Sequence, residues 1–212
     1  MESTICSAGY RLYNNKRESI LKACFMDTPS LTEARENQAR AKLAEGVFLD
    51  SHDFHTFNNV PVQAGLRTIQ IDHVIVSRFG IFAVETKNRN GWIYGSRSDR
   101  QWTQMIAGRK YKFPNPLRRS LIHTLGLAKA LGLSMNKMHP VIVFWGNCEF
   151  RTIMPLNVLN NKLTGFIKSK KKAILTDAEV AVVCAKLNRM KETTARDTGR
   201  TAKMLMRWFG KN

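Results

Sequence analysis

Two acidic residues and one lysine interrupt the apolar runs of the stretch TIQIDHVIVSRFGIFAVETK, which covers residues 68–87. Asp72 lies in its first half, and Glu85 and Lys87 close its second half. Carboxylate oxygens are the ligands that Mg²⁺ prefers, and a neighbouring lysine can orient a water or stabilise extra negative charge on phosphorus. The three residues therefore suit metal-dependent hydrolysis of a phosphodiester, with Asp72 and Glu85 as metal ligands.

Two strands must position these side chains. Residues 66–77 and 81–87 are rich in Ile, Val and Phe, which is typical of strands. If residues 79–80 form a two-residue turn between them, Asp72 lies opposite Lys87. The spacing thus predicts a hairpin that brings the two charges to the same level.

The register of this hairpin decides which side chains share a face. Side chains alternate along a strand, so Glu85 and Lys87 share a face, and the two-residue turn adds Asp72 to it. A three-residue loop without a bulge would send Asp72 to the other face. The alternative to a metal site is an Asp72–Lys87 salt bridge with Glu85 at the solvent edge. Alternation also directs His73 away from Asp72, so we leave it outside the chemistry.

The remaining pattern predicts helices and strands in mixed order around this hairpin. The expected segments are a short helix at 10–25, a helix with a capping box at 30–45, a strand at 47–54 followed by a loop around 58–59, a short strand at 92–95, a helix from Pro116 with a stripe of leucines, a buried strand at 139–146, helices at 157–172 and 176–191, and a polar, then amphipathic tail. This order predicts an α/β domain around a mixed sheet.

Three motifs occur in order along the chain: QIDHVIV, then GIFAVETKNRNG, then FPNPL before a predicted helix. Together they resemble the nuclease-related domain (NERD) family, and Asp72 with Glu85-Thr86-Lys87 is similar to the D-x(n)-E-x-K signature of PD-(D/E)XK nucleases. The resemblance covers roughly Glu33 to Trp145. It implies a restriction-endonuclease-like core, a central mixed sheet flanked by helices. We expect a basic helical segment at 1–29, the nuclease-like domain at 30–155, and a basic helical extension at 156–212, packed on or appended to the core.

The resemblance also implies further site residues. A carboxylate on the first helix often completes the metal site in this fold, and the matching position is Glu36, with Glu33 and Glu45 as the competing acids. The alternative is an exposed Glu36 that pairs with Arg40. Similar proteins usually carry a glutamine where this chain has Arg119, which can bind a phosphate bidentately. His123 matches a histidine common in the family, although a lone histidine is more often part of a core.

The chain is strongly basic, with 34 Lys and Arg against 16 Asp and Glu, a net charge of +18 and a pI near 10.2. Such a field favours a polyanionic partner, with nucleic acid first and an anionic membrane surface second. The resemblance to nucleases puts DNA ahead of RNA. Aromatic residues lie between the basic ones at 89–113, although we expect Trp92, Trp102 and Phe113 to fill the core. The expected nucleic-acid-binding residues are Arg89, Arg97, Arg100, Arg109, Lys110, Lys112, Arg119, Lys170, Lys171 and Lys172.

Four scattered cysteines without a C-x-x-C pair exclude a zinc ribbon. The N-terminus has no apolar leader, and no apolar run approaches about 18 residues. We therefore expect a reduced cytoplasmic protein without stable membrane association.

Three interpretations of the function follow. The first is a nuclease dependent on Mg²⁺ or Mn²⁺, in which Asp72 and Glu85 hold the metal, Lys87 assists the attacking water, and Glu36 adds a third acid. The second is a nucleic-acid-binding module that keeps the fold without catalysis, which Arg119 favours. The third is a basic protein of a membrane surface or the ribosome, which accounts for the charge but not for the acids and Lys87.

Overall fold

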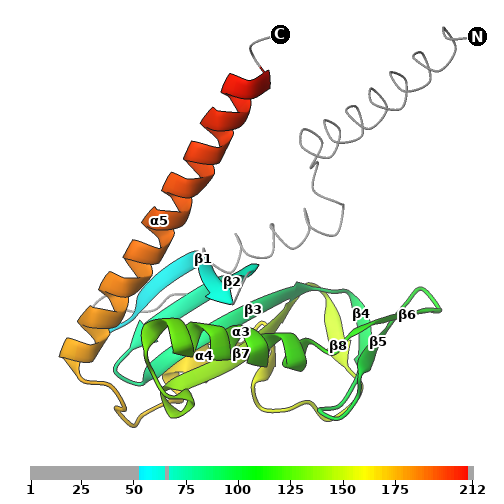
Figure 1. The fold of residues 1–212 in the computed structure, drawn as a ribbon. Coiled ribbons are helices and arrows are strands. Elements are labelled where there is room, and N and C mark those ends of the chain that lie inside the picture. The colour runs from blue at the N-terminus through cyan, green and yellow to red at the C-terminus, as the bar shows by residue number, and fades with distance from the viewer. Residues whose placement is uncertain (1–52, 65–66, 210–212) are drawn as a thin grey trace, which may run out of the picture. The chain divides into compact units, whose positions relative to one another are not determined.

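The computed structural model describes residues 53–64 and 67–209, and the expected helices at 10–25 and 30–45, including Glu36, lie outside the described residues. Within the described part the elements run, in chain order, β1 (His55–Ala64), β2 (Arg67–Ser77), β3 (Gly80–Asn88), β4 (Gly91–Tyr94), β5 (Gln101–Ile106), β6 (Arg109–Pro114), α3 (Pro116–Leu131), the 3-10 turn η1 (Met135–Lys137), β7 (Met138–Trp145), β8 (Cys148–Phe150), β9 (Val158–Asn160), α4 (Leu163–Lys168) and α5 (Asp177–Phe209) (Figure 1).

The strands form two mixed sheets. The larger sheet has the order β1-β2-β3-β7-β9, in which β1, β2 and β3 are antiparallel neighbours while β3-β7 and β7-β9 are parallel. The smaller sheet has the order β6-β5-β4-β8, antiparallel except for the parallel β4-β8 pair. The α/β class with mixed sheets, expected from the order of sequence patterns, is confirmed.

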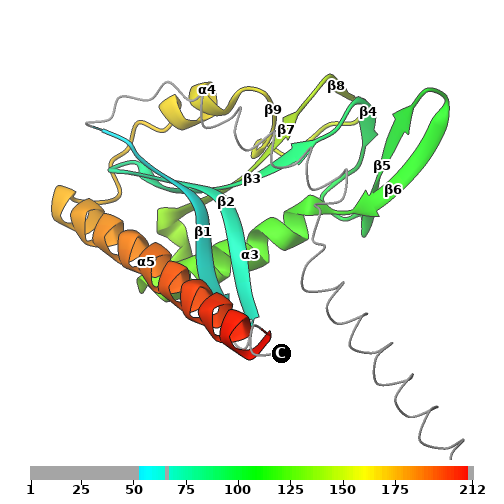
Figure 2. The ribbon, with the colours of Figure 1, turned by 90° about the horizontal axis from the view of Figure 1, so that it is seen from above.

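Helices cover both faces of the larger sheet. Figure 2 shows α3 and α5 on one side of β1–β3 and α4 on the other. Val74 and Ile81 of the sheet pack with Leu127 of α3 and Leu187 of α5 in one core. On the opposite face, alternate residues of the same strands, such as Phe82, pack with Leu163 and Ile167 around α4. Side chains of β2 and β3 therefore alternate between two separate cores, which is why apolar residues occur on both faces of these strands.

A third core joins the smaller sheet to the larger one. The buried indole of Trp102 stacks on Phe144 of β7 with 6.0 Å between ring centroids, and Phe113 completes the contact. The indole nitrogen donates to the Ser96 carbonyl. Trp102 thus anchors the β5–β6 hairpin, and it fills the core as expected.

Several elements differ from the sequence expectation. The loop expected around 58–59 is the middle of β1, and the β5–β6 hairpin was not expected. The helix expected at 157–172 is wrong, because β9 pairs with β7 there and only a short α4 follows. Strands β2, β3, β4 and β7 and helix α3 are confirmed within a few residues. The helix expected at 176–191 begins as expected, but α5 continues to Phe209 through most of the expected tail.

Helix α3 is confirmed, but its buried face is not the expected leucine stripe. Leu121 and Leu125 are exposed at 48% and 47%. The buried face instead runs from Ser120 and His123 to Leu127. Of the polar residues on this face, His123 forms a hydrogen bond with Glu85 of β3, and both belong to the candidate site.

Candidate active site

The β2–β3 hairpin has a different register from the expected one. Its turn is residues 78–79, and its pairs run from Ser77 opposite Gly80 to His73 opposite Val84. At the next position, where the ladder ends, Asp72 comes level with Glu85 instead of Lys87. The expected partner of Asp72 was therefore wrong by two residues. Because the shift is an even number of residues, Glu85 and Lys87 still point to the expected face of the sheet.

Asp72 lies at a distortion shared by two strands. Asn59, beside it in β1, has a left-handed backbone with φ of 53°. The alternation reverses at this level, because Val74 and Ile71, three residues apart, both face the same core. The Asp72 carboxylate turns toward β3, where its Oδ2 accepts from the Thr86 amide at 2.7 Å and from the Thr86 hydroxyl at 2.7 Å. The carboxylate thereby replaces a ladder bond and is fixed beside the Glu85–Thr86 peptide.

Glu85 faces helix α3 and is held by two of its side chains. His123 Nδ1 forms a hydrogen bond with Glu85 Oε1, and the guanidinium Nε of Arg119 lies 3.9 Å from Oε2. Asp72 and Glu85 are only 2% and 3% exposed, which excludes the alternative of Glu85 at a solvent edge. We call these five residues, Asp72, Glu85, Thr86, Arg119 and His123, the carboxylate centre.

Lys87 follows two residues after Glu85 and so lies on the same face of β3 by alternation. It is half-buried, and it stands beside Phe144 in the parallel β3–β7 pair. The chain then turns at Gly91, whose φ of 80° favours glycine and where a Cβ would meet the Met105 carbonyl at 2.3 Å. The close backbone contact at Gly91, where the chain passes from the larger sheet to the smaller one, fixes the position of the end of β3 that carries Lys87.

The NPL motif positions the helix that supplies Arg119 and His123. Asn115 Oδ1 accepts from the Leu117 amide and caps α3, and Pro116 occupies the first turn. The Asn115 side-chain nitrogen is also within donor distance of the carbonyls of Ser96, Arg97 and Asp99. Asparagine at this position therefore ties the start of α3 to the loop between β4 and β5.

The chemistry of the centre fits a hard divalent cation. Mg²⁺ typically takes one or two carboxylates and keeps several waters, so Asp72 and Glu85 are an adequate protein contribution. Zn²⁺ sites use three or four His, Cys or carboxylate ligands, and the described residues contain no group of three or more His, Cys, Asp or Glu able to hold a metal. The predicted third acid, Glu36, lies outside the described residues.

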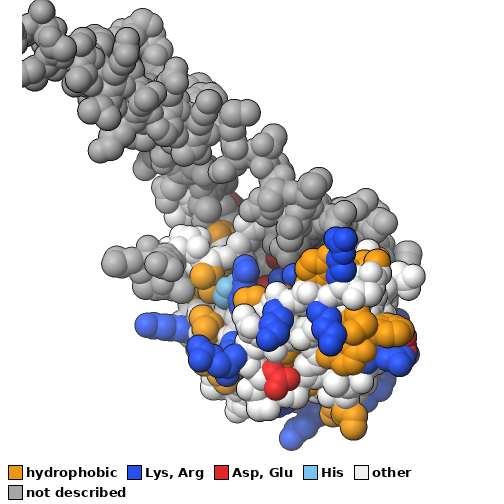
Figure 3. All heavy atoms as spheres, turned by 90° about the vertical axis from the view of Figure 1, so that its right-hand side faces the viewer, with side chains coloured by type: hydrophobic (Ala, Val, Ile, Leu, Met, Phe, Trp, Pro, Cys, Tyr) orange, Lys and Arg blue, Asp and Glu red, His pale blue; other side chains and the backbone are white. Residues whose placement is uncertain are grey.

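The predicted nucleic-acid-binding residues fall into separate groups. The Arg89 guanidinium contacts residues of the smaller sheet: it donates to Gln104 Oε1 and lies 4.7 Å from the centroid of the Phe113 ring. Arg97 and Lys170 line a pocket between α3, the start of β7 and α4. The others that are exposed on the surface are Arg100, Arg109, Lys110, Lys112, Arg119, Lys171 and Lys172. Lys and Arg side chains are spread over the face of the molecule that carries β4–β6, with little acidic surface between them (Figure 3).

Aromatic residues of the same region divide between core and surface. Trp102 and Phe113 are buried, as expected. Trp92 is 42% exposed under the guanidinium of Arg151, so its expected place in the core is wrong. Tyr111, between two exposed lysines of β6, is also exposed. Trp92 and Tyr111 are thus the rings available for stacking.

Sequence reasoning missed two residues of the region. Thr86 holds Asp72, although strand alternation gives no reason to expect a contact with it. Ser120 is buried on α3, and its hydroxyl is one of the buried side-chain atoms without a hydrogen-bond partner in the described part of the chain. Its spacing of three residues before His123 was the only signal in the sequence.

Comparison with known proteins identifies the family. The nuclease-related domain family matches residues 32–145, more than half of the chain, and the chain belongs to this family. An uncharacterized protein of Bacillus anthracis is 37% identical over 98 residues, which are 43% of this chain and 46% of the relative. The chain thus matches less than half the length of that relative. No solved structure matches the chain. Over residues 53–64 and 67–209, no helix is both long enough and apolar enough to cross a bilayer.

Proposed function

We propose that this protein is a divalent-metal-dependent nuclease with a restriction-endonuclease-like core, and that it hydrolyses phosphodiester bonds of nucleic acid, DNA in preference to RNA. One observation carries the proposal: Asp72 and Glu85 are both almost fully buried and stand level with each other on the adjacent strands β2 and β3. Lys87 follows two residues after Glu85 on β3. Two adjacent buried carboxylates destabilise a fold unless cations compensate them, and such groups cluster at functional sites.

Each residue has a role that follows from its place. Asp72 and Glu85 would hold Mg²⁺ or Mn²⁺, with Glu36 as a third acid. When bound, the metal polarises the phosphate and makes a water easier to ionise. Lys87 orients the attacking water or stabilises the charge that develops on phosphorus. Arg119, more than half exposed, binds the substrate phosphate.

His123 is a positioning residue. Its Nδ1 holds one Glu85 oxygen, which orients the carboxylate for the metal. Because a hydrogen bond to the charged carboxylate fixes its rotamer, the geometry is set before the substrate arrives. Thr86 performs the same task for Asp72 with its amide and hydroxyl.

The test is cleavage of labelled plasmid and single-stranded DNA in Mg²⁺, Mn²⁺ or EDTA. We expect cutting in the metals, none in EDTA, and none for Glu85→Ala or Lys87→Ala. Glu149→Ala and Lys129→Ala, which remove exposed charges away from the centre, serve as matched controls. Wild-type protein that binds DNA but never cuts it would overturn the nuclease assignment.

A second candidate is a nucleic-acid-binding module without catalysis. The observation in its favour is the distance of 3.9 Å between Arg119 and Glu85, because this cation partly neutralises the carboxylate without a metal. The same assay separates the two: salt-sensitive binding by wild type without cleavage in any metal supports the module.

A further inference from the structure

A pocket lies on the other side of α3, at an incomplete edge of the larger sheet. Strand β9 pairs only with residues 142–144 of β7, so the first half of β7 has no neighbouring strand there. Pro140 stands in this half, and a proline has no amide hydrogen to offer another strand. The pocket, which we call the edge pocket, is about 570 Å³, within the size range of small-molecule sites. It is bounded by α3, the start of β7, the segment before β9, and α4.

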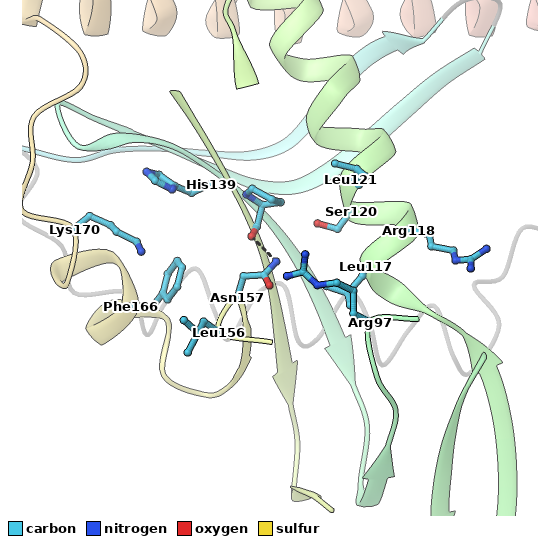
Figure 4. A pocket seen from close by; sticks show the side chains of 11 residues that line it. Arg97, Leu117, Arg118, Ser120, Leu121, His139, Leu156, Asn157, Phe166 and Lys170 are labelled. Carbon is cyan, nitrogen blue, oxygen red and sulfur yellow. Dashed lines mark hydrogen bonds between the residues drawn. The ribbon is translucent and has the colours of Figure 1, made fainter. Parts of the chain in front are cut away.

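Two cations approach the edge pocket from opposite sides. In Figure 4 the guanidinium of Arg97 and the ammonium of Lys170 both point into the hollow, whereas the guanidinium of Arg118 points away. None of the described residues that line the pocket is acidic. The field inside therefore selects an anion, and two separated cations suit two negative groups better than one.

Between the cations the lining is largely apolar. Phe166 lies beside Lys170, whose Nζ is 4.5 Å from the centroid of its ring, and Leu117 and Leu156 add aliphatic surface. A planar aromatic group fits such a lining, because ring stacking gains free energy without a hydrogen-bond pattern.

Polar atoms complete the edge pocket. Ser120 is 2% exposed and borders the pocket on the α3 side. Its hydroxyl oxygen is itself buried, so we assign it no contact with a ligand. Asn157 directs its side-chain nitrogen to the Pro140 carbonyl at 3.0 Å. His139 donates from Nε2 to the Phe79 carbonyl at 3.0 Å, which leaves Nδ1 as an acceptor in the neutral ring.

We infer that the edge pocket binds one unpaired nucleotide of a nucleic-acid strand, with the base against Phe166 and the flanking phosphates at Arg97 and Lys170. A nucleotide within a strand has a phosphate on each side, which matches two cations at opposite sides of an apolar hollow. The inference rests on the proposed function for the nature of the ligand, and it assigns a substrate class: strands with an unpaired segment, in preference to a continuous duplex.

The experiment measures binding of the full chain in EDTA, so that no cleavage occurs. A labelled ten-nucleotide oligothymidylate, a duplex of equal length and free thymidine 5′-monophosphate are compared by fluorescence anisotropy or by competition. The test variant is Arg97→Gln with Lys170→Gln. The matched control is Lys129→Gln with Lys191→Gln, which removes the same charge from exposed positions of α3 and α5 that do not line the pocket.

We expect the test variant to lose about tenfold in affinity for the single strand, and its slope of log affinity against log salt to fall by about 0.7 per cation removed. The control should lose much less, and the duplex should be affected equally by both. Phe166→Leu keeps an apolar side chain but removes the ring, and should weaken the single strand by about tenfold.

Three results would overturn the inference: equal loss of single-strand affinity in test and control, equal loss for single strand and duplex, or binding of the free nucleotide without the strand. The cleavage assay tests the nuclease function separately. If the protein never cuts DNA but shows the expected selectivity, the proposed function is wrong and the inference about the pocket stands. If it cuts DNA without the selectivity, only the inference about the pocket is wrong.

Discussion

The two sides of helix α3 have opposite chemistry. Toward β2 and β3 lie the buried acids of the carboxylate centre, and toward β7 and β9 lies the edge pocket, lined by cations and by no acid among its described residues. Arg119 and Ser120 are neighbours in sequence, yet they belong to different regions, because successive residues of an α-helix point about 100° apart. The difference teaches that charge is not spread evenly over the described residues: the buried acids Asp72 and Glu85 lie on neighbouring strands with Arg119 beside Glu85, whereas cations alone line the edge pocket.

The largest effect that would test this contrast is on catalysis. Lys87→Gln should lower the cleavage rate by about 100- to 1,000-fold, because it removes one charge that stabilises the transition state. Affinity for single-stranded DNA in EDTA should stay nearly unchanged, since the edge pocket is intact. Initial rates and anisotropy on the same preparation measure both. A parallel fall in rate and affinity would contradict the separation of the two regions.

A stability comparison along α3 sharpens the contrast. His123→Ala leaves buried Glu85 without its main hydrogen-bond partner and should lower the free energy of unfolding by about 1–3 kcal/mol. Ser120→Ala removes a buried hydroxyl that has no partner and should be neutral or slightly stabilising. Urea unfolding of both variants measures the difference. Equal losses would mean that the two buried polar residues do the same structural work.

The neighbouring arginines offer a smaller test. Arg119→Gln should reduce cleavage by about tenfold, because a charge-assisted hydrogen bond to phosphate is lost. Arg118→Gln should change it little, because this side chain is exposed and its guanidinium points away from the edge pocket in Figure 4. The change in stability should be small for both because the side chains are exposed. A rise in activity for Arg119→Gln would instead show that this arginine competes with the metal for Glu85.

The smallest expected effect depends on pH. Burial is the main cause that lowers the pKa of His139 below its usual value of 6.5, and the charge of Lys170 lowers it further, against the Phe79 hydrogen bond. Above pH 6.5 the ring is neutral in both the folded and the unfolded chain. As the pH falls below 6.5, the unfolded chain takes up the proton first, so stability is lost. Unfolding at pH 7.5 and 5.5 should show a smaller decrease for His139→Gln than for wild type.

The apolar patterns predicted the elements that bury apolar faces. Much of β2, β3 and β7 is apolar on both faces because helices or a second sheet cover them, and their content of Ile, Val and Phe favours strands over helices. The β5–β6 hairpin was missed because Trp102 and Phe113 are its main buried side chains, and exposed polar residues hide the alternation. β9 was missed because it is three residues long and is defined by its partner β7.

The candidate site was predictable in its residue types more than in its contacts. Asp72, Glu85 and Lys87 were evident from their charge within apolar strands. The predicted register of the β2–β3 hairpin was wrong because the sequence does not determine which two residues form the turn. The side chains still point to the predicted faces because the register shifted by an even number of residues. The contact between Asp72 and Thr86 occurs beside a distortion at Asn59, which adopts positive φ. The pair Asn58–Asn59 was the signal in the sequence, because asparagine is enriched at positive φ, but it was interpreted as a loop.

The family match ends at Trp145, the last residue of β7, but the hydrophobic core does not. Leu175 and the α5 residues Val180, Val183 and Leu187 are buried against the same sheet face as α3, and β9 extends that sheet beyond β7. A shortened chain that stopped at residue 145 would expose this apolar surface to water and leave β7 as an open edge. Boundaries for recombinant expression should therefore follow the core and not the family match, because the shorter product is expected to aggregate.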